Sequence, residues 1–174
     1  MRARMRGALT AIAVAFVALT SLAAPVAAGA AAGGQVPFKG SVAGLETTTG
    51  FTPPSTVSII LEGTGNATHL GRFTLVNPHD VDLSTMTGCG PEVLTAANGD
   101  SVTAFGCGVA ALVSGIPPLA VLSIVEDYKI TGGTGRFAGA SGSYHVERIL
   151  HQGTPGATTG SFEGTISSPG ASKH

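Results

Sequence analysis

Two neighbouring segments of the sequence carry charged or phenolic side chains on an otherwise apolar face. Glu126 and Tyr128 alternate in step with the apolar residues of one segment. Tyr144 and Arg148 do the same in the next. The apolar residues on these faces are Ala120, Leu122, Ile124, Ile130, Val146 and Leu150. Because the apolar face of a strand points toward the core, this pattern directs the polar side chains inward. A buried carboxylate beside a guanidinium would form the polar end of an apolar pocket, with Glu126 as a candidate acid or base.

The burial of this charged pair depends on the register of the two segments. Antiparallel pairing about a roughly symmetric connection over residues 132–141 places Glu126 almost opposite Arg148. The alternative is a β-bulge that reverses the alternation, so that both side chains point to solvent and form a weak surface pair. Because buried charges are rare, the surface pair is the favoured interpretation, and the buried pair stays open.

The two cysteines lie on either side of a predicted hairpin turn at Asn98-Gly99. A three-residue loop, with Gly99 in the left-handed conformation, pairs residue 96 with residue 100 and sets Cys89 directly opposite Cys107. Their Cα atoms would then approach to roughly 4.5 Å, within disulfide range. A two-residue loop would offset the cysteines by one position and turn them to opposite faces. We therefore predict a Cys89–Cys107 disulfide, since the spacing does not match a reactive C-x-x-C pair.

A glycine-rich stretch, ITGGTGRFAGASGSY over residues 130–144, raises the alternative of a nucleotide-binding loop. Such a loop must open a helix whose N-terminus holds the phosphate. The residues that follow alternate as in a strand, and no Lys-Ser/Thr pair of a P-loop is present. The stretch therefore predicts a β-corner in which glycines supply positive φ and Phe137 packs back as a plug.

The other candidate chemical groups are scattered. The five histidines, which show no metal-ligand spacing, are His69, His79, His145, His151 and His174. No G-x-S-x-G nucleophile elbow occurs. The sequence therefore predicts no metal site and no cofactor.

Gly and Pro interrupt every window long enough for a helix, so strands must position these residues. Short runs rich in Val, Ile, Leu, Thr and Phe are the candidates for these strands. The predicted strands are 36–46, 57–64, 69–83, 92–97, 101–111, 119–131, 141–151 and 158–167. Asn77-Pro78 predicts a bend or bulge within the third. An even series of neighbouring strands favours an all-β, eight-stranded antiparallel up-and-down barrel, with a two-sheet sandwich as the alternative.

Three stretches resemble the barrels of the allene oxide cyclase and dirigent families. They are Ile130–Phe137 with the small residues after it, Gly160–Ile166 and Thr68–Thr74. The resemblance, to exported bacterial relatives of these families, implies an eight-stranded barrel with a hydrophobic interior. The cyclases act on an oxidised fatty acid, and dirigent proteins steer phenoxy-radical coupling. No shared motif places the functional residues of either family on this sequence, so the resemblance implies fold and not activity.

The N-terminus has the pattern of an export signal. Three arginines among the first six residues precede the uncharged apolar run Ala8–Ala24, and Val26-Ala27-Ala28 fits a cleavage site. We expect residues 1–28 to be a cleaved signal peptide and residues 29–174 to form one secreted domain, extracellular or periplasmic, with no membrane span. Without the signal, six Lys/Arg face ten Asp/Glu, and the formal charge moves from −1 to −4. This acidic balance makes nucleic acid an unexpected partner.

These features predict a non-enzymatic barrel that binds or shields a small apolar molecule. The residues predicted to line its ligand site are Phe73, Leu122, Ile124, Glu126, Tyr128, Tyr144, Arg148, Phe162 and Ile166. One alternative is a cyclase- or isomerase-type enzyme that acts on an oxidised lipid or phenolic through Glu126. Another is a structural barrel whose own side chains fill the core. The resemblance to dirigent barrels, which are often multimeric, also raises a homo-oligomer as an alternative to a monomer.

Overall fold

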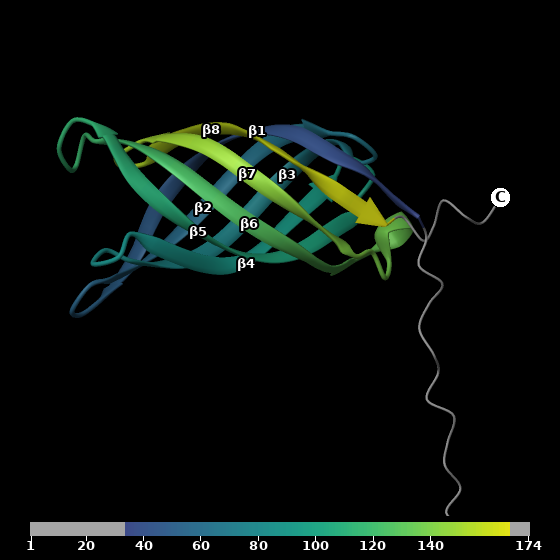
Figure 1. Cartoon of the computed structure of the whole chain (residues 1–174), viewed down its shortest axis with the longest axis horizontal. Helices are drawn as coiled ribbons and strands as arrows, with labels where there is room; N and C mark the ends of the chain where they lie inside the picture. Colours follow the sequence, from purple (N-terminus) through teal and green to yellow (C-terminus); the bar gives the residue numbers. More distant parts are fainter. Residues whose placement is uncertain (1–33, 168–174) are drawn as a thin grey trace, which may run out of the picture.

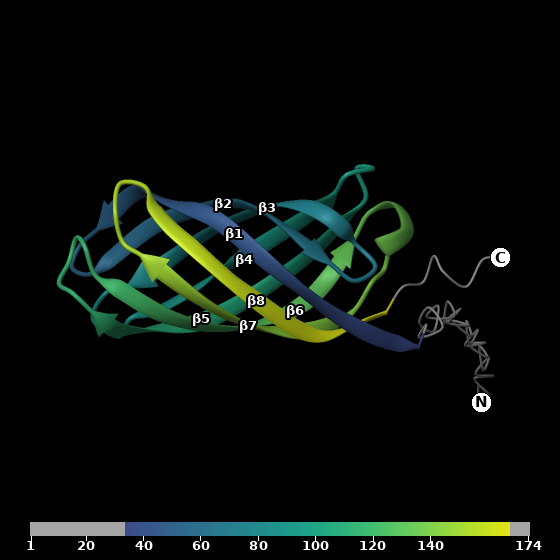
Figure 2. The ribbon, with the colours of Figure 1, turned by 90° about the horizontal axis from the view of Figure 1, so that it is seen from above.

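The computed structural model describes residues 34–167, which form a closed barrel of eight antiparallel strands (Figure 1). The elements are β1 Gln35–Thr52, β2 Thr56–Ala67, β3 Gly71–Asp82, β4 Thr87–Ala96, β5 Ser101–Ser114, β6 Val121–Gly133, the short 3₁₀ helix η1 Gly135–Phe137, β7 Gly142–His151 and β8 Gly156–Ser167. Each strand pairs with the next, and β8 pairs back onto β1 (Figure 2). The predicted up-and-down barrel is confirmed, and the alternative sandwich is wrong. The predicted signal peptide, residues 1–28, lies outside the described residues.

The Asn77-Pro78 step does not split the third strand. Strand β3 runs through both residues with no register shift toward β2. On the other side, pairing with β4 stops at Val76 and resumes at Asp80. Within this gap the Asn77 side-chain amide donates a hydrogen bond of 2.8 Å to the carbonyl oxygen of Pro91. The expected bend or bulge is therefore only a local interruption of one ladder, because proline has no N–H to contribute.

The β4–β5 hairpin has the three-residue loop that the cysteine positions predict. The Ala96 N–H donates to the Asp100 carbonyl at 2.8 Å, and Gly99 has a φ of 89°. Cys89 is paired directly with Cys107, and the two form a disulfide with Cα atoms 4.1 Å apart. Both cysteines lie on the exposed outer face of the barrel. The predicted disulfide is confirmed.

The glycine-rich stretch between β6 and β7 forms a corner, as predicted. It contains the single turn of η1, and the β7 strand follows it (Figure 1). Phe137 is fully buried and closes this end of the barrel. Gly135 has a φ of 57°, which explains a glycine at this position.

Within residues 34–167, no helix has the length and hydropathy needed to cross a membrane.

Buried side chains inside the barrel form two separate apolar clusters. The larger one extends toward the η1 end and includes Phe38, Phe73, Phe137, Tyr144, Phe162 and Ile166. The smaller one contains Ala120, Leu122, Ile124 and Leu150. Inward-facing glycines make room for the large rings. A Cβ atom on Gly106 would lie 2.5 Å from Cδ1 of Tyr128, and one on Gly40 would lie 2.6 Å from Cζ of Phe162. The barrel is therefore packed at one end and less filled at the other.

Candidate functional site

Glu126 and Arg148 point into the barrel from adjacent strands. Strands β6 and β7 pair without a register shift, so the alternation that the sequence shows is preserved. Glu126 pairs with Val146 and Arg148 pairs with Ile124, which makes the two charged residues diagonal neighbours on the inner face. Their exposed fractions are 9% and 4%. The favoured interpretation of a surface pair was wrong, because the bulge it needed does not occur.

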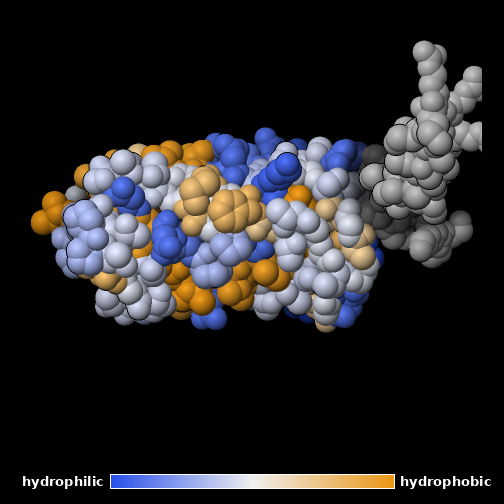
Figure 3. Space-filling view, turned by 90° about the horizontal axis from the view of Figure 1, so that it is seen from below, coloured by the Kyte–Doolittle hydropathy of each residue, from blue (hydrophilic) through white to orange (hydrophobic). Residues whose placement is uncertain are grey.

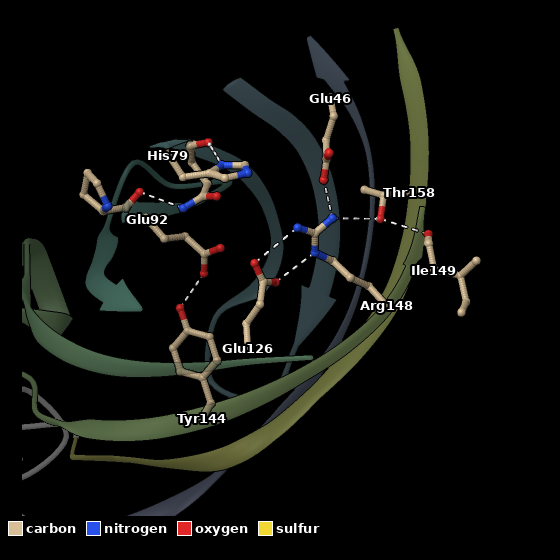
Figure 4. Close-up of polar contacts among 10 residues, drawn as sticks. Glu46, His79, Glu92, Glu126, Tyr144, Arg148, Ile149 and Thr158 are labelled. Carbon is tan, nitrogen blue, oxygen red and sulfur yellow. Dashed lines mark hydrogen bonds and ion pairs between the residues drawn. The ribbon is translucent and has the colours of Figure 1, made fainter. Parts of the chain in front are cut away.

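Arg148 is the centre of a buried ionic cluster (Figure 4). Its Nε donates to Glu126 Oε2 at 2.8 Å, and its Nη2 donates to Glu126 Oε1 at 3.2 Å. Its Nη1 donates to a carboxylate oxygen of Glu46, and also to Thr158 Oγ1 at 3.2 Å. Thr158 in turn donates to the carbonyl oxygen of Ile149 at 3.0 Å. We call Glu46, Glu126, Arg148 and Thr158 the Arg148 cluster.

The charges of this cluster hold one another in place. Burial opposes the charge on the Arg148 guanidinium, but the hydrogen bond and charge of Glu126, together with Glu46, outweigh it and raise the pKa of Arg148. A bidentate bond to one carboxylate and a further bond to a second satisfy most of the N–H groups of the guanidinium. The cluster is thus a rigid polar layer across an apolar interior.

Sequence reasoning missed Glu46 and Thr158. Phe38, Val42 and Glu46 are the buried residues of β1 at a regular spacing, and this alternation was the only available signal. Glu46 lies 102 residues from Arg148 in the sequence. Strand β8 lies between the strands that carry them, so only closure of the barrel brings their side chains together.

A third buried carboxyl group, that of Glu92, lies deeper in the barrel. Tyr144 donates its hydroxyl hydrogen to Glu92 Oε1 (Figure 4). The Tyr144 ring is also stacked on Tyr128, with ring centroids 5.2 Å apart. Burial, aided by the charge of Glu126, raises the pKa of Glu92 to about 7 against the opposing effect of the Tyr144 hydrogen bond and the Arg148 charge. Burial and the charge of Glu92 raise the pKa of Tyr144 as well. Glu92 was also missed, although it alternates with the buried Leu94.

A cavity of about 230 Å³ lies on the side of the Arg148 cluster away from η1. Its apolar wall includes Val57, Ile59, Val81, Leu122, Ile124 and Leu150. Glu46, Glu126 and Arg148 form its polar end, and His79 and Gln152 also line it. An apolar cavity of about 150 Å³ is enough to hold benzene, so this cavity has room for a small organic molecule.

Of the nine residues predicted to line a ligand site, four border the cavity and five belong to the packed apolar cluster. Leu122, Ile124, Glu126 and Arg148 border the cavity. The residues that instead belong to the packed cluster are Phe73, Tyr128, Tyr144, Phe162 and Ile166. Of these, Tyr144 and Phe162 border only a void of about 20 Å³, too small for a ligand. Phe73 borders the same void and also a separate pocket of about 610 Å³ whose lining includes Ser41, Thr64 and Arg72. The aromatic residues fill the barrel because inward glycines opposite them leave space for their rings.

Exposed apolar side chains occur at the same end of the barrel as the cavity. The β5–β6 connection carries Ile116, which is 78% exposed, and Leu119 beside Pro117 and Pro118. Hydrophobic residues appear in orange at the left-hand end of the molecule and along part of its wall in Figure 3.

Within residues 34–167, no three His, Cys, Asp or Glu side chains are grouped as a metal site.

The comparisons with known proteins identify the fold only. No known family profile matches the chain. No curated protein matches it either. Among solved structures, the pterocarpan synthase dirigent protein GePTS1 superposes with a TM-score of 0.50 at 10% sequence identity, over 80% of this chain and 88% of the other. This likeness supports a dirigent-like barrel fold and assigns no residue a role.

Proposed function

We propose that this dirigent-like barrel is an exported, non-enzymatic protein that binds and shields one small, mostly apolar molecule in the cavity beside the Arg148 cluster. The observation that carries the proposal is the cavity itself, an apolar space of about 230 Å³ inside a closed barrel with a charged layer at its inner end. An eight-stranded barrel has an interior just wide enough for one small ligand. Export rests on the N-terminal sequence pattern and agrees with the disulfide.

The apolar wall of the cavity and its polar end contribute differently to binding: the wall provides affinity and the polar end provides orientation. Removing apolar ligand surface from water contributes about 25 cal/mol per Å², so the wall supplies most of the affinity. A few fixed polar groups orient a ligand in such a site, and the Arg148 cluster is held rigidly enough to do so. Both oxygens of Glu126 already accept hydrogen bonds from Arg148, which favours a binding role over a free catalytic base.

A matched pair of variants tests the proposal. Ala110 lines the cavity, whereas the adjacent Ala111 is exposed on the outer face. Calorimetric titration with 1-octanol is expected to show binding to the wild type and to Ala111→Phe, and none to Ala110→Phe, whose ring fills the cavity. Equal octanol binding by both variants would place the ligand elsewhere, and no binding by the wild type would remove the proposed function.

A further inference from the structure

The polar atoms that face the cavity are mainly hydrogen-bond acceptors. Glu46 and Glu126 contribute carboxylate oxygens, and the Arg148 guanidinium is already committed to them and to Thr158. Four of its five N–H groups are used in these bonds. A ligand head group at this end would therefore meet several carboxylate lone pairs and one remaining Arg148 N–H, while the Thr48 hydroxyl and the Gln152 amide are further donors that line the cavity.

The charges at the polar end of the cavity do not balance. Two carboxylates face one guanidinium, which leaves a formal excess of one negative charge. Among the described residues that line the cavity, Arg148 is the only lysine or arginine. Glu92, farther into the barrel, adds a further carboxyl group rather than a cation. An uncompensated charge away from water is costly, so this end of the cavity favours a positive partner.

Two amide oxygens in the interior lack hydrogen-bond donors. Oε1 of Gln152, a cavity-lining residue, is buried and accepts no hydrogen bond. Oδ1 of Asn77 is also unpartnered, in a side chain that is only 1% exposed. Buried acceptors of this kind cost stability unless a donor reaches them. The Gln152 oxygen is independent of the charge count and points to the same ligand chemistry, a donor rather than an acceptor, whereas Asn77 does not line the cavity.

We propose that the cavity selects an organic cation, an apolar body that carries a protonated amine, with the ammonium group against Glu46 and Glu126. The inference rests on the proposed binding function and names the ligand class. An ammonium donates three hydrogen bonds and supplies the missing positive charge. A carboxylate of the same shape would meet two carboxylates and an arginine that they already neutralise.

Calorimetric titration of the wild type at pH 7 with octylamine, 1-octanol and octanoate separates the two proposals. We expect octylamine to bind about tenfold more tightly than 1-octanol, because a charge-assisted hydrogen bond replaces a neutral one, and octanoate to bind most weakly. Octanol binding that equals or exceeds octylamine binding would overturn the cation inference alone. Failure of all three ligands to bind would overturn the binding function as well.

Glu46→Gln provides a variant that keeps the shape of the cluster. It leaves one carboxylate, Glu126, bonded to Arg148 through two hydrogen bonds, so the remaining charges balance. We expect the preference for octylamine over 1-octanol to disappear. An unchanged octylamine preference would contradict the assignment of the head group to this carboxylate. Ala110→Phe should abolish octylamine binding. Octylamine that still binds to this variant would be bound outside the cavity, which would contradict the assignment.

Discussion

Arg148 and Glu46 form an ion pair inside the barrel although 102 residues separate them in the chain. With Glu126 they make a charged layer that divides the interior into a packed part and a cavity. The wall of the cavity, its polar end and the chemistry we infer for its ligand all depend on this layer.

The first prediction concerns the stability that is lost when Glu46 and Glu126 no longer face a cation. Arg148→Met should destabilise the protein by about 3–5 kcal/mol, because it leaves two buried carboxylates without their cation. Urea unfolding followed by circular dichroism measures the loss. The triple variant that adds Glu46→Gln and Glu126→Gln should recover much of it. Lys39→Met, at an exposed ion pair with Glu163, should be nearly silent, and an equal loss there would contradict the argument.

The second prediction concerns the disulfide on the outer face. Cys89→Ser combined with Cys107→Ser should lower the free energy of unfolding by about 3 kcal/mol, because the cross-link no longer restrains the unfolded chain. A reducing agent should produce a similar loss in the wild type and no further loss in the variant. If oxidised and reduced wild type unfold at the same urea concentration, the hairpin needs no covalent link.

The third prediction tests the space that glycine leaves for a ring. Gly106→Ala should destabilise the barrel by about 1–3 kcal/mol, because its Cβ would lie 2.5 Å from Cδ1 of Tyr128, which is stacked on Tyr144. Gly50→Ala is the matched control, since its Cβ would have no neighbour closer than 3.7 Å. Comparable unfolding midpoints for the two variants would show that the ring moves freely.

The fourth prediction is a pH dependence of stability that arises from Glu92. Its pKa is raised from 4.5 to about 7, so the folded state holds a proton that the unfolded state releases. Its contribution to stability is therefore complete below pH 4.5 and decreases as the pH rises toward 7. Glu92→Gln should remove this slope and exceed the wild type in stability at pH 8, as urea unfolding at each pH would show. Parallel stability curves for the two proteins would exclude the effect.

Local patterns predicted much of this structure because their causes are local. The Asn98-Gly99 turn sets the register of the β4–β5 hairpin, and that register determines that Cys89 meets Cys107. The alternation along β6 and β7 likewise predicted which side chains share a face. Only the rarity of buried charge argued against placing Glu126 and Arg148 inside, and their two mutual hydrogen bonds, which balance the two charges, overcame it.

The sequence by itself determined the succession of strands, the hairpin register and the glycine corner, because each follows from residues close together in the chain. The tertiary structure alone decided that Glu46 reaches Arg148 and that Tyr144 reaches Glu92, since these contacts require strands on different sides of the ring to face a common interior. It also decided that the aromatic residues fill one end while the cavity lies at the other. That division depends on the summed volumes of inward side chains and glycines from all eight strands, a quantity that exists only after the barrel has closed.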